Sequence, residues 1–173
     1  MDQLERLRTR VPASRRPEKP PSDAIEHGVE SGNVPSVGQL VRQVLDGMGS
    51  RYIVEDDDVY GRWEAGLFHV TDLGDSGPVV QVHGTWERCL PEDEYSKAAI
   101  FCNEWNAENA FPKAYAQVDE EHRIVGIFGE TTVDLSAGLT PAHVDVLVNQ
   151  GIGTTLGLFE AAAKAFPGAS PIH

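Results

Sequence analysis

The chain has 173 residues, 40% hydrophobic and 24% charged, a composition close to that of ordinary globular proteins, so we expect one principal domain. Its net charge of −13 argues against nonspecific nucleic-acid binding, because displacing counterions from phosphates requires a basic surface. The sequence has no apolar run long enough for a membrane-spanning helix, and its first residues lack the apolar core of a signal peptide, so we expect a cytoplasmic protein without a membrane span.

The N-terminal stretch differs from the rest of the chain in charge and composition. The first 19 residues contain six basic and three acidic residues, whereas the remainder carries a net charge of −16. Five of the 11 prolines lie between Val11 and Pro35, where apolar residues show almost no period. We therefore expect residues 1–35 to form a disordered, basic, proline-rich tail, which either recruits an acidic partner or lipid or contacts the acidic domain of its own chain.

The first predicted helix begins after Ser36, a suitable N-cap, and continues with apolar residues at helical spacing to Gly47. Three β-rich stretches follow, at 52–60, 66–73 and 79–88. The five turn-forming residues 74–78 connect the last two stretches and predict a hairpin.

A hairpin centred on Ser76 fixes which side chains share a face. Residues whose numbers sum to 152 would lie opposite each other, so His69 would face His83 and Glu64 would face Arg88. One face then carries Phe68, Val70, Val80, Val82 and Trp86, and the other carries His69, Thr71, Gln81, His83 and Thr85. This alternation is typical of an antiparallel sheet with one buried face and one exposed face.

The second half of the chain predicts a helix, two strands and a last helix. The middle helix starts at Pro91 and runs to about Asn109, and the strands at 113–118 and 123–135 follow. Thr140 caps the last helix, which stops at Pro167. The sequence therefore predicts an α+β fold in the order α-β-β-β-α-β-β-α over residues 36–166, with a C-terminal tail at 167–173. We expect five antiparallel strands covered by the middle and last helices.

Short motifs connect this pattern to a family. The motifs are Asn103-Glu104-Trp105-Asn106, Phe111-Pro112-Lys113-Ala114-Tyr115, Asp134-Leu135 and Gly138-Leu139-Thr140. From about Ser36 to Phe166 the sequence resembles the YbjN-domain proteins of bacteria, described as sensory transduction regulators, whose fold is similar to that of type III secretion chaperones. The resemblance implies a chaperone-like or regulatory protein. It implies no established catalytic residues.

Three motifs could bind a ligand or a metal, and each has a structural interpretation. The glycines at 151, 153 and 157 interrupt a helical pattern and lack a phosphate-binding lysine, so we interpret them as allowing a kink or a close helix contact. His69 and His83 could share a metal, but no third ligand lies beside them, which favours a solvated or partner-covered pair. The stretch Asp56–Asp58 lacks the ligand spacing of an EF-hand and predicts a solvated turn.

Catalytic residues do not stand out in the sequence. No serine lies in a Gly-x-Ser-x-Gly elbow, and Cys102 lies on the apolar stripe of the middle helix, where a packed thiol is expected. Two cysteines are too few for a disulfide framework or a four-thiolate zinc site. We therefore expect a non-enzymatic protein that requires no cofactor.

Two functions remain open from the sequence alone. The first is a protein-binding module, a chaperone-like or regulatory adaptor that forms a homodimer and binds a polypeptide segment. Its candidate partner-binding residues are Trp63, His69, Thr71, Gln81, His83 and Thr85, of which Trp63 is either an exposed aromatic anchor or part of the core. The second is a small-ligand sensor or small enzyme with a pocket between the sheet and the helices.

Overall fold

The structure, a computed structural model, describes residues 35–63, 65–74 and 77–172. The predicted tail therefore lies, except for Pro35, outside the described residues, and so does the predicted pair partner Glu64. The elements are α2 (Val37–Gly47), β1 (Tyr52–Glu55), β2 (Asp58–Trp63), β3 (Gly66–Asp72), β4 (Val79–Pro91), a 3-10 turn η1 (Glu92–Glu94), α3 (Tyr95–Glu108), β5 (Lys113–Asp119), β6 (Ile124–Asp134), α4 (Pro141–Ala165) and β7 (Ser170–Pro171).

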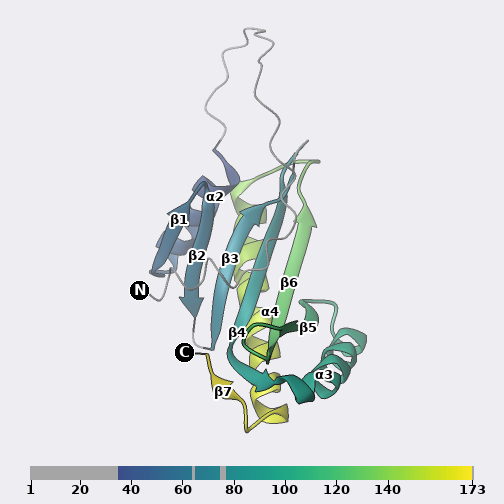
Figure 1. Ribbon diagram of the computed structural model, residues 1–173. Coiled ribbons are helices and arrows are strands. Elements are labelled where there is room, and N and C mark those ends of the chain that lie inside the picture. The colour runs from purple at the N-terminus through teal and green to yellow at the C-terminus, as the bar shows by residue number, and fades with distance from the viewer. Residues whose placement is uncertain (1–34, 64, 75–76, 173) are drawn as a thin grey trace, which may run out of the picture. The chain divides into compact units, whose positions relative to one another are not determined.

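The strands form one antiparallel sheet in the order β1-β2-β3-β4-β6-β5, and β7 pairs with β4 (Figure 1). The α+β fold with an antiparallel sheet is thus confirmed. The helices begin where the capping residues predicted, because the Ser36 and Thr140 hydroxyls each accept a hydrogen bond from a backbone N–H of the first helical turn. None of the helices in the described ranges has the length and apolar character needed to span a bilayer.

The sheet has seven strands in the described residues, and the expected number of five is wrong. The stretch 52–60 forms part of two strands, because Asp56 and Asp57 adopt left-handed φ angles of 49° and 73° and close a two-residue hairpin. Aspartate tolerates this conformation better than most residues, and two such residues in succession match the twist of a tight hairpin. The seventh strand, Ser170–Pro171, lies in the stretch expected to be a C-terminal tail.

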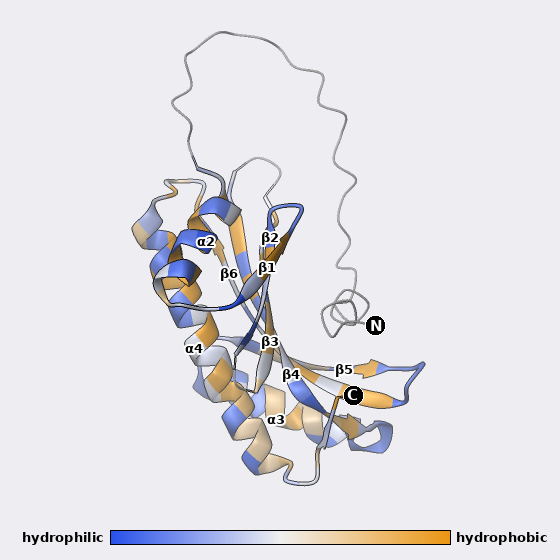
Figure 2. Ribbon diagram, turned by 90° about the vertical axis from the view of Figure 1, so that its left-hand side faces the viewer, coloured by the Kyte–Doolittle hydropathy of each residue, from blue (hydrophilic) through white to orange (hydrophobic). Residues whose placement is uncertain are grey.

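Helices α2 and α4 pack on each other and on the same face of the sheet (Figure 2). The expectation that the middle and last helices cover the sheet omitted α2, and α3 packs mainly on β5. Only two residues of α3, Ala98 and Cys102, are fully buried, so its apolar stripe is narrower than the sequence pattern indicated. In contrast, α2 buries Leu40, Val41 and Leu45 against its neighbours.

The contact between α3 and β5 depends on the Asn-x-Trp-Asn motif. The side-chain amide of Asn106 binds both backbone groups of Ala114, at 2.8 Å to its carbonyl oxygen and 2.7 Å from its N–H. The Trp105 indole N–H donates to the Pro112 carbonyl oxygen at 3.2 Å. These bonds pair the end of the helix with the start of the strand, so the motif fixes where β5 begins.

Helix α4 approaches the sheet closely where side chains are absent. Gly84 and Gly129 are opposite each other on β4 and β6, and a Cβ on them would lie 2.6 and 3.0 Å from the Thr155 methyl. On the helix itself, a Cβ at Gly151 would lie 2.9 Å from the Cβ of Val82. The predicted close helix contact therefore holds for Gly151, whereas nothing lies within 4 Å of a Cβ at Gly153.

Two alanine substitutions in α4 separate packing from helix propensity. Gly153→Ala should stabilise the protein by about 0.5–1 kcal/mol, since it gains helix propensity without a steric cost. Gly151→Ala gains the same propensity but forces the helix away from Val82, and overpacking costs about 1–3 kcal/mol. Chemical denaturation measures the difference. Equal stabilisation by both substitutions would contradict the close contact.

Candidate functional site

The face of the sheet opposite α2 and α4 carries the predicted partner-binding residues of β3 and β4. Residues Gly66–Asp72 pair with Val80–Trp86 in the predicted register, so His69 lies directly opposite His83. The other face of this hairpin is buried as expected, with Phe68, Val70, Val80, Val82 and Trp86 at most 2% exposed. We call the outward surface formed by His69, Thr71, Gln81, His83 and Thr85 the polar face.

One end of the polar face is organised around Asp58, which opens strand β2. Its carboxylate accepts a hydrogen bond from the Thr71 hydroxyl at 2.5 Å and lies 3.2 Å from Nε2 of His69. The orientation of Nε2 does not satisfy hydrogen-bond geometry, so His69 contacts this carboxylate without a hydrogen bond from Nε2. Tyr60 stacks on the His69 ring with centroids 4.4 Å apart. A carboxylate and an aromatic ring therefore hold this imidazole in place.

The other end is organised around His83, which is only 5% exposed. Its Nε2 lies 2.9 Å from the Tyr115 hydroxyl, and its ring packs against Phe128, which in turn stacks on Tyr115. Burial lowers the pKa of His83 to about 4, with a smaller contribution from the charge of His69. Burial also raises the pKa of Tyr115 to about 12. Both groups are neutral at pH 7 and share one hydrogen bond.

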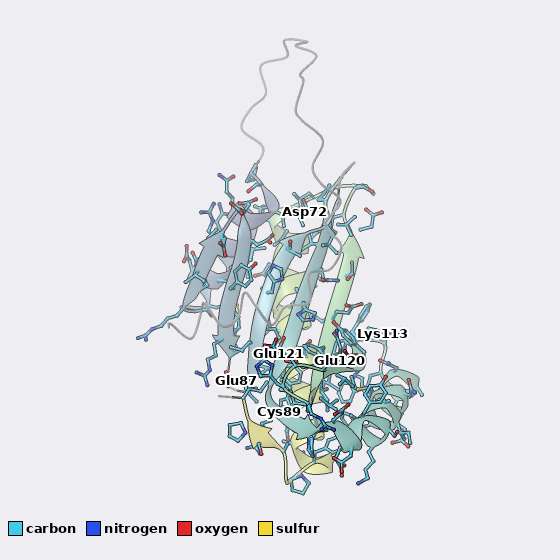
Figure 3. The ribbon with its side chains drawn as sticks, in the orientation of Figure 1. Asp72, Glu87, Cys89, Lys113, Glu120 and Glu121 are labelled. Carbon is cyan, nitrogen blue, oxygen red and sulfur yellow. The ribbon has the colours of Figure 1, made fainter. Side chains whose placement is uncertain are left out.

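The cover over His83 comes from the β5–β6 hairpin. The hairpin leaves the plane of the sheet on the side of the polar face, as Figures 1 and 2 show from two directions. Figure 3 labels Glu120 and Glu121 at the tip of this hairpin. An acidic hairpin therefore borders the polar face, while Tyr115 and Phe128 of the same hairpin supply aromatic contacts.

The structure divides the six predicted residues into three groups. Thr71, His83 and Thr85 are buried, which differs from the solvated face that the sequence suggested. His69 keeps 13% of its side chain exposed, with its Nε2 buried, and Gln81 is half-buried. The Gln81 amide donates to the Thr132 hydroxyl at 3.0 Å. Trp63 lies on the opposite face, where its ring packs edge-on against Phe68 and its N–H donates to the Ser50 hydroxyl. The structure therefore does not bring Trp63 together with the other five.

Sequence reasoning missed Asp58, Tyr60, Tyr115 and Phe128. Asp58 was assigned to a solvated turn because β2 was not recognised as a separate strand, yet it is 9% exposed. The alternation of Asp58 with Tyr60 is the signal that could have placed both side chains on one face of a strand. No local pattern connects Tyr115 to His83, since their contact depends on the bend of the β5–β6 hairpin.

The polar face can hydrogen-bond and stack through its histidines, hydroxyl groups and aromatic rings. Across the described ranges, no three His, Cys, Asp or Glu residues gather closely enough to hold a metal ion. Cys102 is buried on the other side of the fold, and burial raises the pKa of its thiol to about 11, so it is not a thiolate at neutral pH. The arrangement suits recognition of another molecule.

The chain is similar to known proteins in both sequence and structure. The family model YbjN, described as "Putative bacterial sensory transduction regulator", matches residues 38–164. The structure is similar to one titled "Crystal structure of YbjN, a putative transcription regulator from E. coli", with a TM-score of 0.64 and 16% identity. The similarity covers 80% of this chain and 97% of the E. coli chain, and at this identity it shows a shared fold. No curated protein matches the sequence.

The buried His83 predicts an acid-sensitive stability. Its pKa is about 4 when folded and 6.5 when exposed, so between these values the unfolded chain binds more protons and stability falls as the pH falls. The full loss corresponds to about 3 kcal/mol. His83→Gln keeps a partner for Tyr115 and should remove most of this dependence in thermal melts between pH 7 and 4.

The matched control is His143→Gln, because His143 is exposed, contacts the Gly138 carbonyl oxygen and forms no ion pair among the described residues, so this substitution should leave the pH dependence unchanged. The pKa values of carboxylates such as Asp119 and Asp134 are lowered from the ordinary value of 3.8. These groups therefore change the stability below about pH 4 and do not account for a change between pH 7 and 4. A wild-type pH profile in His83→Gln would show that His83 is not the group responsible.

Proposed function

The chain belongs to the YbjN family of bacterial sensory transduction regulators, and we propose that it regulates by binding a polypeptide on its polar face, without catalysing a reaction. The observation that carries this proposal is the polar face itself. It is a sheet surface free of the described helices, with two preorganised aromatic and histidine clusters. In this proposal the protein acts in the cytoplasm as a chaperone-like adaptor.

The half-buried groups of the polar face supply the direct contacts. His69 and Gln81 have side chains that are partly accessible and fixed by neighbours, so binding them costs little conformational entropy. The buried Thr71, His83 and Thr85 hold the strands and rings around them. A partner would therefore meet a rigid surface of aromatic edges and hydrogen-bonding groups.

Charge selects the class of partner. Residues 35–173 contain 21 acidic and eight basic residues, a net charge of −13, and the hairpin that borders the polar face carries Glu120 and Glu121. Such a surface attracts basic polypeptide segments and repels nucleic acids. Complex formation should weaken as salt is added, because screening reduces the attraction.

Site-specific crosslinking tests this function. A photo-crosslinking amino acid at Gln81 of the full chain should give a covalent product with another protein in living cells, since Gln81 lies on the polar face. The same amino acid at the exposed Glu160 of α4 is the control and should give little product. Equal yields at both positions, or a copurifying small molecule with no crosslinked protein, would contradict the proposal.

We also propose that the protein works as a homodimer. Large apolar side chains remain exposed on the described surface, including Met48 at 43% and Val54 at 40%, and such residues are candidates for an interface. Light scattering should give twice the mass of one 18.8 kDa chain. A single-chain mass at all accessible concentrations would contradict this part of the proposal and leave the polar-face proposal intact.

A further inference from the structure

An apolar groove lies between strand β6 and the first half of helix α4, away from the polar face. It has a volume of about 450 Å³. Its walls include Thr131, Val133 and Leu135 on one side and Val146 and Leu147 on the other, and Phe111 also lines it. Val146 is 60% exposed and Phe111 is 45% exposed, so two large apolar side chains are open to solvent at one site.

The strand that forms one wall of the groove has an open edge. Pairing between β5 and β6 ends at Lys113 and Glu130, so no described strand pairs with Thr131–Asp134 on that side. Leu135 donates its N–H toward β4, to the Pro78 carbonyl oxygen at 2.8 Å. Because alternate residues of a strand point their backbone groups to opposite edges, those of Thr132 and Asp134 point toward the open side.

A buried polar group in the groove also lacks a partner. Thr131 is 4% exposed and lines the groove, and its hydroxyl has no hydrogen-bond partner among the described residues. An unpaired buried hydroxyl costs free energy that a bound ligand with a polar group can recover. The groove therefore offers a hydroxyl, two open backbone positions and an apolar floor to the same ligand.

The side chains of β6 define what an added strand must look like. Val133, Asp134 and Leu135 all line the groove. Alternation along the strand directs the Val133 and Leu135 side chains to the helix side of β6 and the Asp134 side chain to the opposite face at the open edge. The Ser136 N–H donates to the Asp134 carboxylate at 2.8 Å and helps to lower its pKa, so it is charged at neutral pH. A matching strand has apolar residues on the groove side and basic residues on the other.

We infer that this groove binds an extended segment of a partner polypeptide in which apolar and basic residues alternate, and that the segment adds to β6 as a strand. The inference rests on the proposed function, because it names a second site for the same class of partner. Strand addition supplies affinity through backbone hydrogen bonds, and the groove supplies specificity through side-chain pockets. The acidic Asp134 favours this occupant at the groove over a second copy of the chain, whose own groove would bring a second Asp134 carboxylate to the same place.

A labelled peptide tests the inference directly on the full-length protein. The probe is a fluorescein-labelled heptapeptide of alternating Lys and Val, and its control has the same composition with the three Val residues together. Fluorescence anisotropy should show binding of the alternating peptide about tenfold tighter than the control. In antiparallel addition, the pairing found throughout this sheet, the residues opposite Thr132 and Asp134 are lysines. N-methylation of the lysine backbone amides should therefore abolish binding, whereas N-methylation of the valine amides, which point away from β6, should be tolerated.

Four variants locate the site. Val146→Arg should weaken binding about tenfold, whereas Ile100→Arg, with the same charge change at a similarly exposed position on α3, should stay within about twofold of wild type. Thr132→Pro removes an N–H that points to the open edge and leaves the backbone pairing with β4 intact, so it should also weaken binding. Thr132→Val loses only the hydroxyl that Gln81 contacts and should bind like the wild type. Circular dichroism melts show whether each variant is folded.

The outcomes separate the groove from the polar face. Equal binding of both peptides, or equal losses in Val146→Arg and Ile100→Arg, would mean that only net charge acts and would overturn the inference. A dimer that dissociates only in Val146→Arg would assign the groove to a second copy and overturn it as well. If no peptide binds while Gln81 still crosslinks a partner, the groove inference fails and the proposed function stands.

Discussion

The close approach of helix α4 to strands β4 and β6 is the constraint on which the rest of the structure depends. The opposed glycines Gly84 and Gly129 leave room for the Thr155 methyl, so the helix lies deeper on the sheet than side chains would otherwise allow. This depth completely buries Leu158 and Phe159 against the sheet. The large apolar side chains of the central strands therefore pack on the side of the sheet that faces the helices, and polar and aromatic residues occupy the opposite side.

On that opposite side, several buried polar groups are bonded to one another. Asp58 binds Thr71 and approaches His69, and His83 is held by Tyr115 under the bent β5–β6 hairpin. Buried polar groups that are paired in this way fix side-chain positions and resist rearrangement. The polar face thus has few mobile parts, which favours recognition by shape and charge over induced rearrangement.

The same residues that suggested the family also shape the groove. Asn106 and Trp105 bind the backbone of Ala114 and Pro112, so the chain enters β5 at Lys113 and cannot pair with β6 beyond Glu130. The last residues of β6 are left with an open edge beside α4 as a result. A motif that looks like a signature in the sequence therefore acts structurally, by setting the length of one strand pair.

The sequence by itself determined the helix caps at Ser36 and Thr140, the order of the three helices and the β-rich stretches between them, and the β3–β4 register, because these depend on neighbours close in the chain. The hairpin turn at Asp56 and Asp57 was not predicted, although three successive aspartates mark its position in the sequence. Only the tertiary structure decided that His83 is buried, that Trp63 faces the helices and that an open edge adjoins α4. Alternation assigns a side chain to one face of a hairpin, but its exposure depends on which distant segment packs over that face, as Tyr115 and Phe128 do over His83.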